Sequence, residues 1–382
     1  MAAIQSSSWS DLQPELLGLV LQRLPSLADR VRLRAVCRTW QYNARLQSLP
    51  PPLPWLSLLD GTFLSFPSGE IHRMPVPDEA CCHGSIDNWL FLMNNDGWCS
   101  LMNPFSKAML QLPKLPTIGH EMDNPCPLFY KLVVPSFLDL SPESLVAVLI
   151  MDGGFDSTLC ICQPPISTDA ISRLSGDKIY DVVFFSGKLY ALTPVKLFLL
   201  EIADNHKCKP KISSIKCIID SVDYPSMIDR LTPNSYLYAR WNYLVESGGR
   251  LLLVARRIGV LLPLPEHNML QHARTLYFEV FEADLTTDSC CRWRRVSSLA
   301  GQALFVGTCS KSLPAAECGL PQEDCIYFTC DYARARPAPD PLRDSGVFNM
   351  RNGTIAPLLP ETRVVRRVGE RCPTWFFPSE VM

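Results

Sequence analysis

WSDLQPELLGLVLQRLPSLADRVRLRAVCRTWQYNARL, residues 9–46, is the stretch that decides how this chain begins to fold. Leucine and valine recur at helical spacing over residues 12–24, and Pro14 stands where the first turn of a helix tolerates proline. A second apolar stripe runs over residues 33–40. Helices this short cannot bury so many apolar side chains among themselves. The stretch therefore predicts a small helical module with apolar surface left over for a partner.

The order of motifs in this stretch resembles the F-box, a helical module that docks on the Skp-type adaptor of cullin ubiquitin ligases. L-x-P-E-L-L is followed by V-L, by L-P and by V-C-R-x-W. The resemblance implies a three-helix F-box over residues 9–49. By the same resemblance, the adaptor-binding residues are Leu12, Pro14, Glu15, Leu16, Val20, Leu21, Leu24, Leu33, Val36, Cys37 and Trp40. Gln13 is a departure, because many members of the family run Leu-Pro directly. The alternative is that these helices pack only on the rest of the chain.

Composition argues against several classes of partner. The 382 residues carry 36 Lys+Arg and 38 Asp+Glu, so net charge favours neither nucleic acid nor a membrane surface. No apolar run approaches the roughly 20 residues that span a bilayer. The N-terminus, MAAIQSSSW, lacks the basic and apolar parts of a signal peptide, which predicts a location in the cytoplasm and/or nucleus.

The 16 cysteines and six histidines follow no metal-ligand spacing. Without a signal peptide, the cysteines are expected to be reduced thiols that act as small core residues. We expect no metal, no cofactor and no disulfide framework.

PPPLPW, residues 50–55, predicts a stiff proline-rich linker. The pattern of apolar and polar residues changes after it. Beyond it, over residues 56–382, short apolar runs alternate with turn signals. WLFLM (89–93) and WCSLM (98–102) flank a four-residue hairpin turn. Because WLFLM is apolar at every position, such a strand needs cover on both faces, and sheets must stack on sheets.

A weak internal repeat favours a propeller. Residues 61–75 parallel residues 346–360, and residues 100–113 offer a third copy. Candidate inner strands begin near residues 62, 89, 145, 189, 251 and 326. This spacing predicts a mainly β domain, a β-propeller of about six or seven blades, with a β-sandwich pair as the alternative. Ring closure would bury Trp375, Phe376 and Phe377 near the early strands, around residues 63–93.

Strings along the whole chain, from about residue 9 to residue 378, resemble one plant F-box family. They include YLVESGGRLLLV, YFEVFEADL, GQALFVG and DSGVFNMRNGTIAPLLP. The C-terminal half of that family is the domain of unknown function numbered 295, which is regarded as a propeller. The resemblance implies a non-catalytic substrate-recognition subunit of an SCF-type ubiquitin ligase. Its F-box would bind the adaptor, and through it cullin, while its propeller binds a target protein that the resemblance does not identify.

Two other functions are compatible with the same pattern. One is a non-catalytic propeller scaffold or ligand-binding protein with a vestigial F-box. The other is a propeller hydrolase, for which His83, Ser85 and Asp87 are the candidate residues. Adjacent strand positions point to opposite faces, and triads are normally assembled from distant positions, so we expect no catalysis. ARARPAPDPLRD, residues 333–344, predicts a projecting loop.

Overall fold

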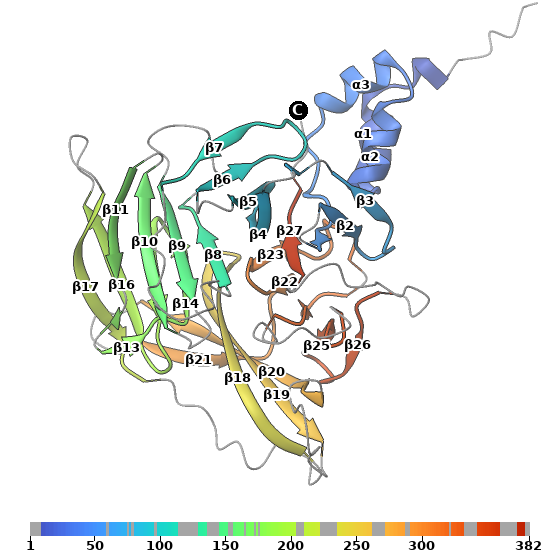
Figure 1. Cartoon of the computed structure of the whole chain (residues 1–382). Coiled ribbons are helices and arrows are strands. Elements are labelled where there is room, and N and C mark those ends of the chain that lie inside the picture. Colours follow the sequence, from blue (N-terminus) through green and yellow to red (C-terminus); the bar gives the residue numbers. More distant parts are fainter. Residues whose placement is uncertain are drawn as a thin grey trace, which may run out of the picture.

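Six sheets of four or five strands stand in a ring and form most of the molecule, with three helices beside them (Figure 1). This arrangement is a six-bladed β-propeller, which confirms the predicted fold class and excludes the β-sandwich. The computed structural model describes residues 9–58, 61–74, 76–77, 80–94, 98–113, 129–135, 145–151, 156–163, 166–171, 173–174, 176–203, 210–221, 235–261, 272–286, 291–320, 322–331, 342–359 and 373–378.

The helical module contains η1 (Trp9–Asp11), α1 (Pro14–Gln22), α2 (Leu27–Arg34) and α3 (Arg38–Arg45). Pro14 occupies the first turn of α1, as the sequence predicts. At the start of α3 the backbone N–H of Trp40 donates to the sulfur of Cys37, 3.4 Å away. Leu17, Leu21 and Ala44 form the module's own small core.

Blades 1 to 3 each run from an innermost strand to an outermost one. Blade 1 consists, in that order, of β27 (Thr374–Phe376), β1 (Trp55–Ser57), β2 (Thr62–Ser65) and β3 (Ile71–Arg73). Blade 2 consists of β4 (Ala80–Ile86), β5 (Trp89–Asn94), β6 (Cys99–Met102) and β7 (Met109–Gln111). Blade 3 consists of β8 (Phe129–Val133), β9 (Val146–Met151), β10 (Ser157–Gln163) and β11 (Ile166–Ile171).

A short pair, β12 (Arg173–Leu174) and β13 (Asp177–Lys178), leads to the other three blades. Blade 4 consists of β14 (Asp181–Phe185), β15 (Lys188–Leu192), β16 (Leu197–Ala203) and β17 (Lys211–Ile219). Blade 5 consists of β18 (Ser235–Ser247), β19 (Arg250–Leu261), β20 (Arg274–Asp284) and β21 (Arg292–Val296). Blade 6 consists of β23 (Lys311–Pro314), β22 (Gln302–Val306), β24 (Cys325–Phe328), β25 (Gly346–Asn349) and β26 (Ile355–Pro357).

The six strands predicted as inner strands exist, one in each blade, but they are not the strands nearest the centre of the ring. They are β2, β5, β9, β15, β19 and β24, which lie in the interior of their sheets. Contacts between blades instead connect β27, β4, β8, β14, β18 and β23. An interior strand is covered on both faces by neighbouring blades, so it carries a continuous apolar run such as β9, where all six residues are buried. The innermost strands carry polar groups, among them Lys131 and Asp181, and lack that signal.

The internal repeat corresponds to the outer hairpins of three neighbouring blades. Residues 61–75 contain β2 and β3, residues 346–360 contain β25 and β26, and residues 100–113 contain β6 and β7 for the most part. Blades 6, 1 and 2 follow one another around the ring. The repeat is therefore a blade-level repeat.

The last strand closes the ring, as predicted. β27 pairs antiparallel with β1 and brings Trp375 opposite Leu56. Trp375 and Phe376 are fully buried, and the ring of Phe376 lies 5.2 Å from that of Phe63. Blade 1 thus combines the first and the last strands of the domain. β1 begins at Trp55, the final residue of the predicted linker.

No disulfide joins the cysteines that the structure describes, and most of these cysteines are buried. In the same part of the chain, no three His, Cys, Asp or Glu side chains form a group that would hold a metal ion. None of the described helices is long and apolar enough to cross a membrane.

Candidate functional site

Exposed apolar side chains gather on the helical module. Of the fifteen large hydrophobic residues that are exposed in the described part of the chain, eight lie within residues 9–46. They are Trp9, Leu16, Leu19, Val20, Val31, Val36, Tyr42 and Leu46. Such a density on a small surface is typical of a protein–protein contact.

Helix α1 presents two apolar stripes with different roles. Leu17 and Leu21 point into the module's core and are fully buried. Leu16, Leu19 and Val20, at positions i, i+3 and i+4, are 47, 48 and 43% exposed. The outer stripe offers an apolar surface on which a partner helix can pack, because nothing in the described part of the chain covers it.

The predicted adaptor-binding residues fall into three groups. Glu15, Leu16, Val20 and Val36 are exposed; Leu21 is buried in the module's core; and the half-buried group is Leu12, Pro14, Leu24, Leu33, Cys37 and Trp40. Some half-buried members have structural roles, since Trp40 Nε1 donates to the Trp9 carbonyl at 2.9 Å. Adaptor binding by the set stays a prediction.

Several exposed residues of the surface were missed by the sequence prediction. Leu19 is spaced three residues from Leu16, so the helical period could have found it. Tyr42 and Leu46 lie four residues apart at the end of α3. The polar residues around them make this apolar pair hard to recognise in the sequence.

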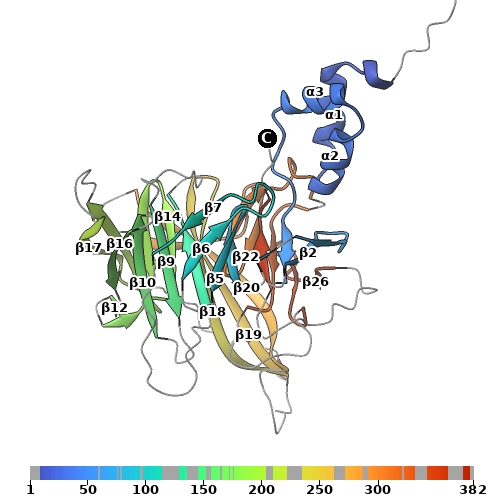
Figure 2. The ribbon, with the colours of Figure 1, turned by 45° about the horizontal axis from the view of Figure 1, so that its top comes forward.

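The helical module is seated on blade 1, beside β2 (Figures 1 and 2). Leu27 of α2 is buried in an apolar cluster with Trp55, Phe63 and Phe376 of the propeller. The fully buried Arg30 donates from Nε to the Leu24 carbonyl at 2.6 Å and from Nη1 to the Pro50 carbonyl at 2.7 Å.

Further contacts stabilise the interface between the helical module and blade 1. The backbone N–H of Leu53 donates to the Pro25 carbonyl at 3.0 Å. Arg32 pairs with Glu70 of blade 1 at 2.6 Å, and this hydrogen bond raises the pKa of Arg32. Module and propeller therefore share an apolar cluster and polar contacts across the proline-rich segment.

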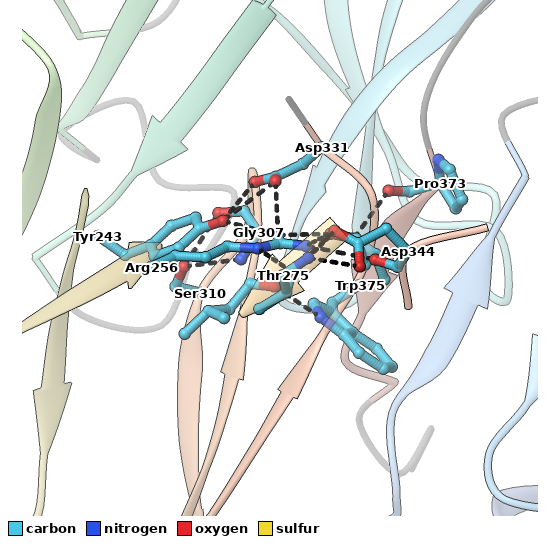
Figure 3. A network of polar contacts seen from close by, with 11 residues as sticks. Tyr243, Arg256, Thr275, Gly307, Ser310, Asp331, Asp344, Pro373 and Trp375 are labelled. Atoms are coloured by element: carbon cyan, nitrogen blue, oxygen red, sulfur yellow. Dashed lines mark hydrogen bonds and ion pairs between the residues drawn. The ribbon is translucent and has the colours of Figure 1, made fainter. Parts of the chain in front are cut away.

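A buried polar network ties blade 5 to blade 6 (Figure 3). Arg256 of β19 lies 3.1 Å from Asp331 Oδ1 and 2.9 Å from Asp344 Oδ2. Its Nε donates to Thr275 at 2.8 Å, and the Tyr243 hydroxyl donates to Asp331 at 3.0 Å. Burial is the largest cause that raises the pKa of Tyr243 well above its ordinary value. Both acids are bound within the protein, so the network is a structural tie.

Asp331 lies two residues before the predicted projecting loop, and Asp344 is the last residue of that loop. Residues 332–341, which include most of that loop, lie outside the described residues. The guanidinium of Arg256 also lies 4.7 Å from the ring centre of Phe328, so the tie includes a cation–π contact.

The Ser-His-acid candidates of the hydrolase alternative do not form a triad. The Ser85 hydroxyl donates to the Trp375 carbonyl at 2.5 Å, and Asp87 pairs with Lys311 of blade 6. The ring of His83 packs edge-on at 6.2 Å from Phe91. The Ser85 contact joins blade 2 to blade 1, the Asp87 contact joins blade 2 to blade 6, and the His83 contact lies within blade 2.

Helices with an exposed apolar stripe, seated on a six-bladed propeller, define the class of F-box proteins with a C-terminal propeller domain. Residues 63–349 match the model of the KIB1-4 β-propeller. The chain belongs to this family.

Curated relatives are F-box proteins of Arabidopsis thaliana. F-box protein SKIP23 is 23% identical over 394 residues, which cover 91% of this chain and 90% of SKIP23. A putative F-box protein is 25% identical over 359 residues, which cover 85% of this chain and 86% of the relative. Another putative F-box protein is 28% identical over 126 residues, and there the chain spans only 31% of the relative's length.

Solved structures are more distant. Oligogalacturonate lyase in complex with manganese is 10% identical, with a TM-score of 0.31, and the match covers 79% of this chain and 70% of the lyase. The N-terminal domain of Nup159 is 10% identical, with a TM-score of 0.27, and the match covers 78% of this chain and 74% of that domain. Likeness at these scores carries no argument about function.

Proposed function

We propose that this protein is a substrate-recognition subunit of an SCF-type ubiquitin ligase. Its helical module binds a Skp-type adaptor, and through it cullin, while its propeller binds the target protein. The protein itself performs no bond chemistry. It raises the effective concentration of target lysines near the charged ubiquitin-conjugating enzyme.

The outer stripe of α1 is the observation that carries the proposal. Leu16, Leu19 and Val20 stay exposed although the module buries its own core and is seated on blade 1. The likeness to F-box proteins over most of the chain supports the same role. A vestigial module would have no reason to keep this stripe apolar.

The test is co-purification of the full chain with a plant Skp-type adaptor. Each buried leucine or valine contributes roughly 1.5–3 kcal/mol in transfer terms, so the pair Leu16→Ala and Val20→Ala should weaken binding at least about a hundredfold. The matched control is Val195→Ala with Ile215→Ala, two propeller positions of the same exposure, 43 and 47%. Equal adaptor binding by the two folded double variants would refute the proposal, and so would failure of the parent protein to bind any adaptor.

A further inference from the structure

Three arginines flank Trp293 in β21, and two serines follow them in the string CRWRRVSSLA, residues 291–300. Arg294 and Arg295 stand three and two residues before Ser297. At no other place in the sequence do two consecutive arginines precede a serine or threonine at this distance. Many serine/threonine kinases select their substrates by acidic residues that pair with arginines at these two positions. The string therefore indicates a phosphorylation site for a kinase that prefers basic substrates.

Ser297 is accessible in the folded protein. It is exposed in the bend directly after β21. β21 is the outermost strand of blade 5, and no strand in the described part of the chain pairs with its outer side. Peripheral strands open locally at a lower free energy than core strands, and a kinase binds its substrate as an extended segment. The segment before Ser297 is thus already in the conformation that a kinase binds.

Ser298, the next residue in the chain, is tied to blade 6 instead. Its hydroxyl donates to Asp324 Oδ1 at 3.0 Å, and the backbone N–H of Leu299 donates to the same oxygen at 2.6 Å. The side chain of Leu299 is fully buried. These contacts hold the chain just beyond Ser297, so they favour Ser297 over Ser298 as the acceptor.

The two arginines can pair with a kinase without leaving an acid of the propeller alone. The side chain of Arg294 is 64% exposed and lies 3.0 Å from Glu282. That of Arg295 is 44% exposed and lies 3.5 Å from Glu279. Exposed ion pairs contribute little to stability. Each acid also has a second arginine partner on β19, at 3.8 Å for Glu282 and at 3.2 Å for Glu279.

We propose that Ser297 is the phosphorylation site of an ATP-dependent serine/threonine kinase that prefers basic substrates. Ser297 Oγ attacks the γ-phosphorus of MgATP, and the new bond forms as the bond from that phosphorus to the bridging oxygen breaks. The hydroxyl proton passes to a base of the kinase, and ADP leaves. The inference goes beyond the proposed function and does not depend on adaptor binding.

The phosphate would stand beside a cavity between blades 5 and 6. The cavity has a volume of about 410 Å³, and its lining includes Phe278 and Phe348, whose rings lie 5.4 Å apart. Ser297 and Arg295 also line it, and residues two apart on an extended segment share a face. A phosphoserine adds about −1.5 to −2 charges, with which Arg295 can pair. Phosphorylation thus changes the charge at this cavity.

The test incubates the folded full chain with MgATP and the catalytic subunit of cAMP-dependent protein kinase, which prefers basic substrates. Intact mass gives the number of phosphates per chain, and peptide fragmentation in a mass spectrometer locates the acceptor. We expect about one phosphate per chain, on Ser297. A kinase that prefers acidic substrates should modify this residue at least about tenfold more slowly under the same conditions.

Two variants separate the acceptor from its recognition. Ser297→Ala removes the hydroxyl, and Arg294→Gln combined with Arg295→Gln removes the two charges. Each should lower phosphate incorporation about tenfold or more. The matched control is Ser68→Ala, at an exposed serine that no arginine precedes by two or three residues. The control should be modified like the parent, and circular dichroism checks that every variant is folded.

A synthetic peptide of residues 291–300 separates the motif from its accessibility. The kinase should modify both the peptide and the folded chain at Ser297. A modified peptide beside an unmodified folded chain would overturn the inference, because β21 would then be closed to a kinase. Phosphate on another residue, or unchanged incorporation in either variant, would overturn it as well.

Discussion

Replacing Trp375 with alanine tests whether the last strand holds the ring together. Trp375 is fully buried, packs edge-on at 5.1 Å from Phe305, and donates from Nε1 to the Val306 carbonyl at 3.1 Å. Deleting such an aromatic side chain costs about 3–5 kcal/mol, and leaving the carbonyl without its donor adds about 1 kcal/mol. The sum is a large share of the roughly 5–15 kcal/mol that typically stabilises a folded protein.

The assay is equilibrium urea unfolding, followed by far-ultraviolet circular dichroism and by tryptophan fluorescence. We expect the Trp375→Ala midpoint to fall far below that of the parent in both signals. Trp375→Phe should fall between them, since it retains most of the apolar contact. The control is Trp98→Ala at a site that is 46% exposed, with an expected change within about 0.5 kcal/mol. If Trp375→Ala unfolds like Trp98→Ala, the closing strand contributes nothing and the reasoning is wrong.

Three further predictions concern the seat, the buried network and the thiols. Leu27→Glu should release the helical module from blade 1 and expose the segment 50–54 to proteases, with Val31→Glu, at an exposed site on the same helix, as control; equal cleavage would contradict the seat. Arg256→Met leaves two buried carboxylates without their cation and should cost about 3–5 kcal/mol in urea unfolding, while a negligible loss would show that the network is unimportant. Burial raises the pKa of the Cys160 thiol to about 12 and that of the Cys309 thiol to about 11, from an ordinary 9.0. Their contribution to the free energy of unfolding is therefore complete below pH 9 and is lost as the pH rises through these values. Thermal midpoints should therefore decline above pH 9, and native thiolate absorbance should lag behind that of the unfolded chain.

Secondary structure was predicted best where the apolar residues follow a single period, that of a strand or that of a helix. The apolar run of β5 and the helical stripe of α1 both predicted their elements, because burial on both faces of a strand and on one face of a helix leaves different patterns. The same logic could not find the innermost strands of the blades. Lys131 and Asp181 are buried at 2.6 Å from one another, and a buried ion pair looks like two surface residues in a sequence.

The exposed apolar surface of the helical module was only partly predictable. Leu16 and Leu21 both belong to helical stripes, and periodicity alone cannot say which stripe faces the module's own core. That choice depends on α3, whose Ala44 meets Leu21 and not Leu16. The packing of Leu27 in one cluster with Phe376 could not be predicted at all, since the two residues are almost 350 positions apart in the sequence.

The composition of blade 1 has a consequence for synthesis on the ribosome. Leu27 leaves the exit tunnel almost 350 residues before Phe376, one of its partners in the shared cluster. A nascent chain can form its early hairpins, but it completes neither blade 1 nor the seat of the helices until β27 has emerged. A chain truncated before residue 373 would thus carry its helices on an unfinished surface. The helices therefore reach their joined position on the propeller only after β27 has been synthesised.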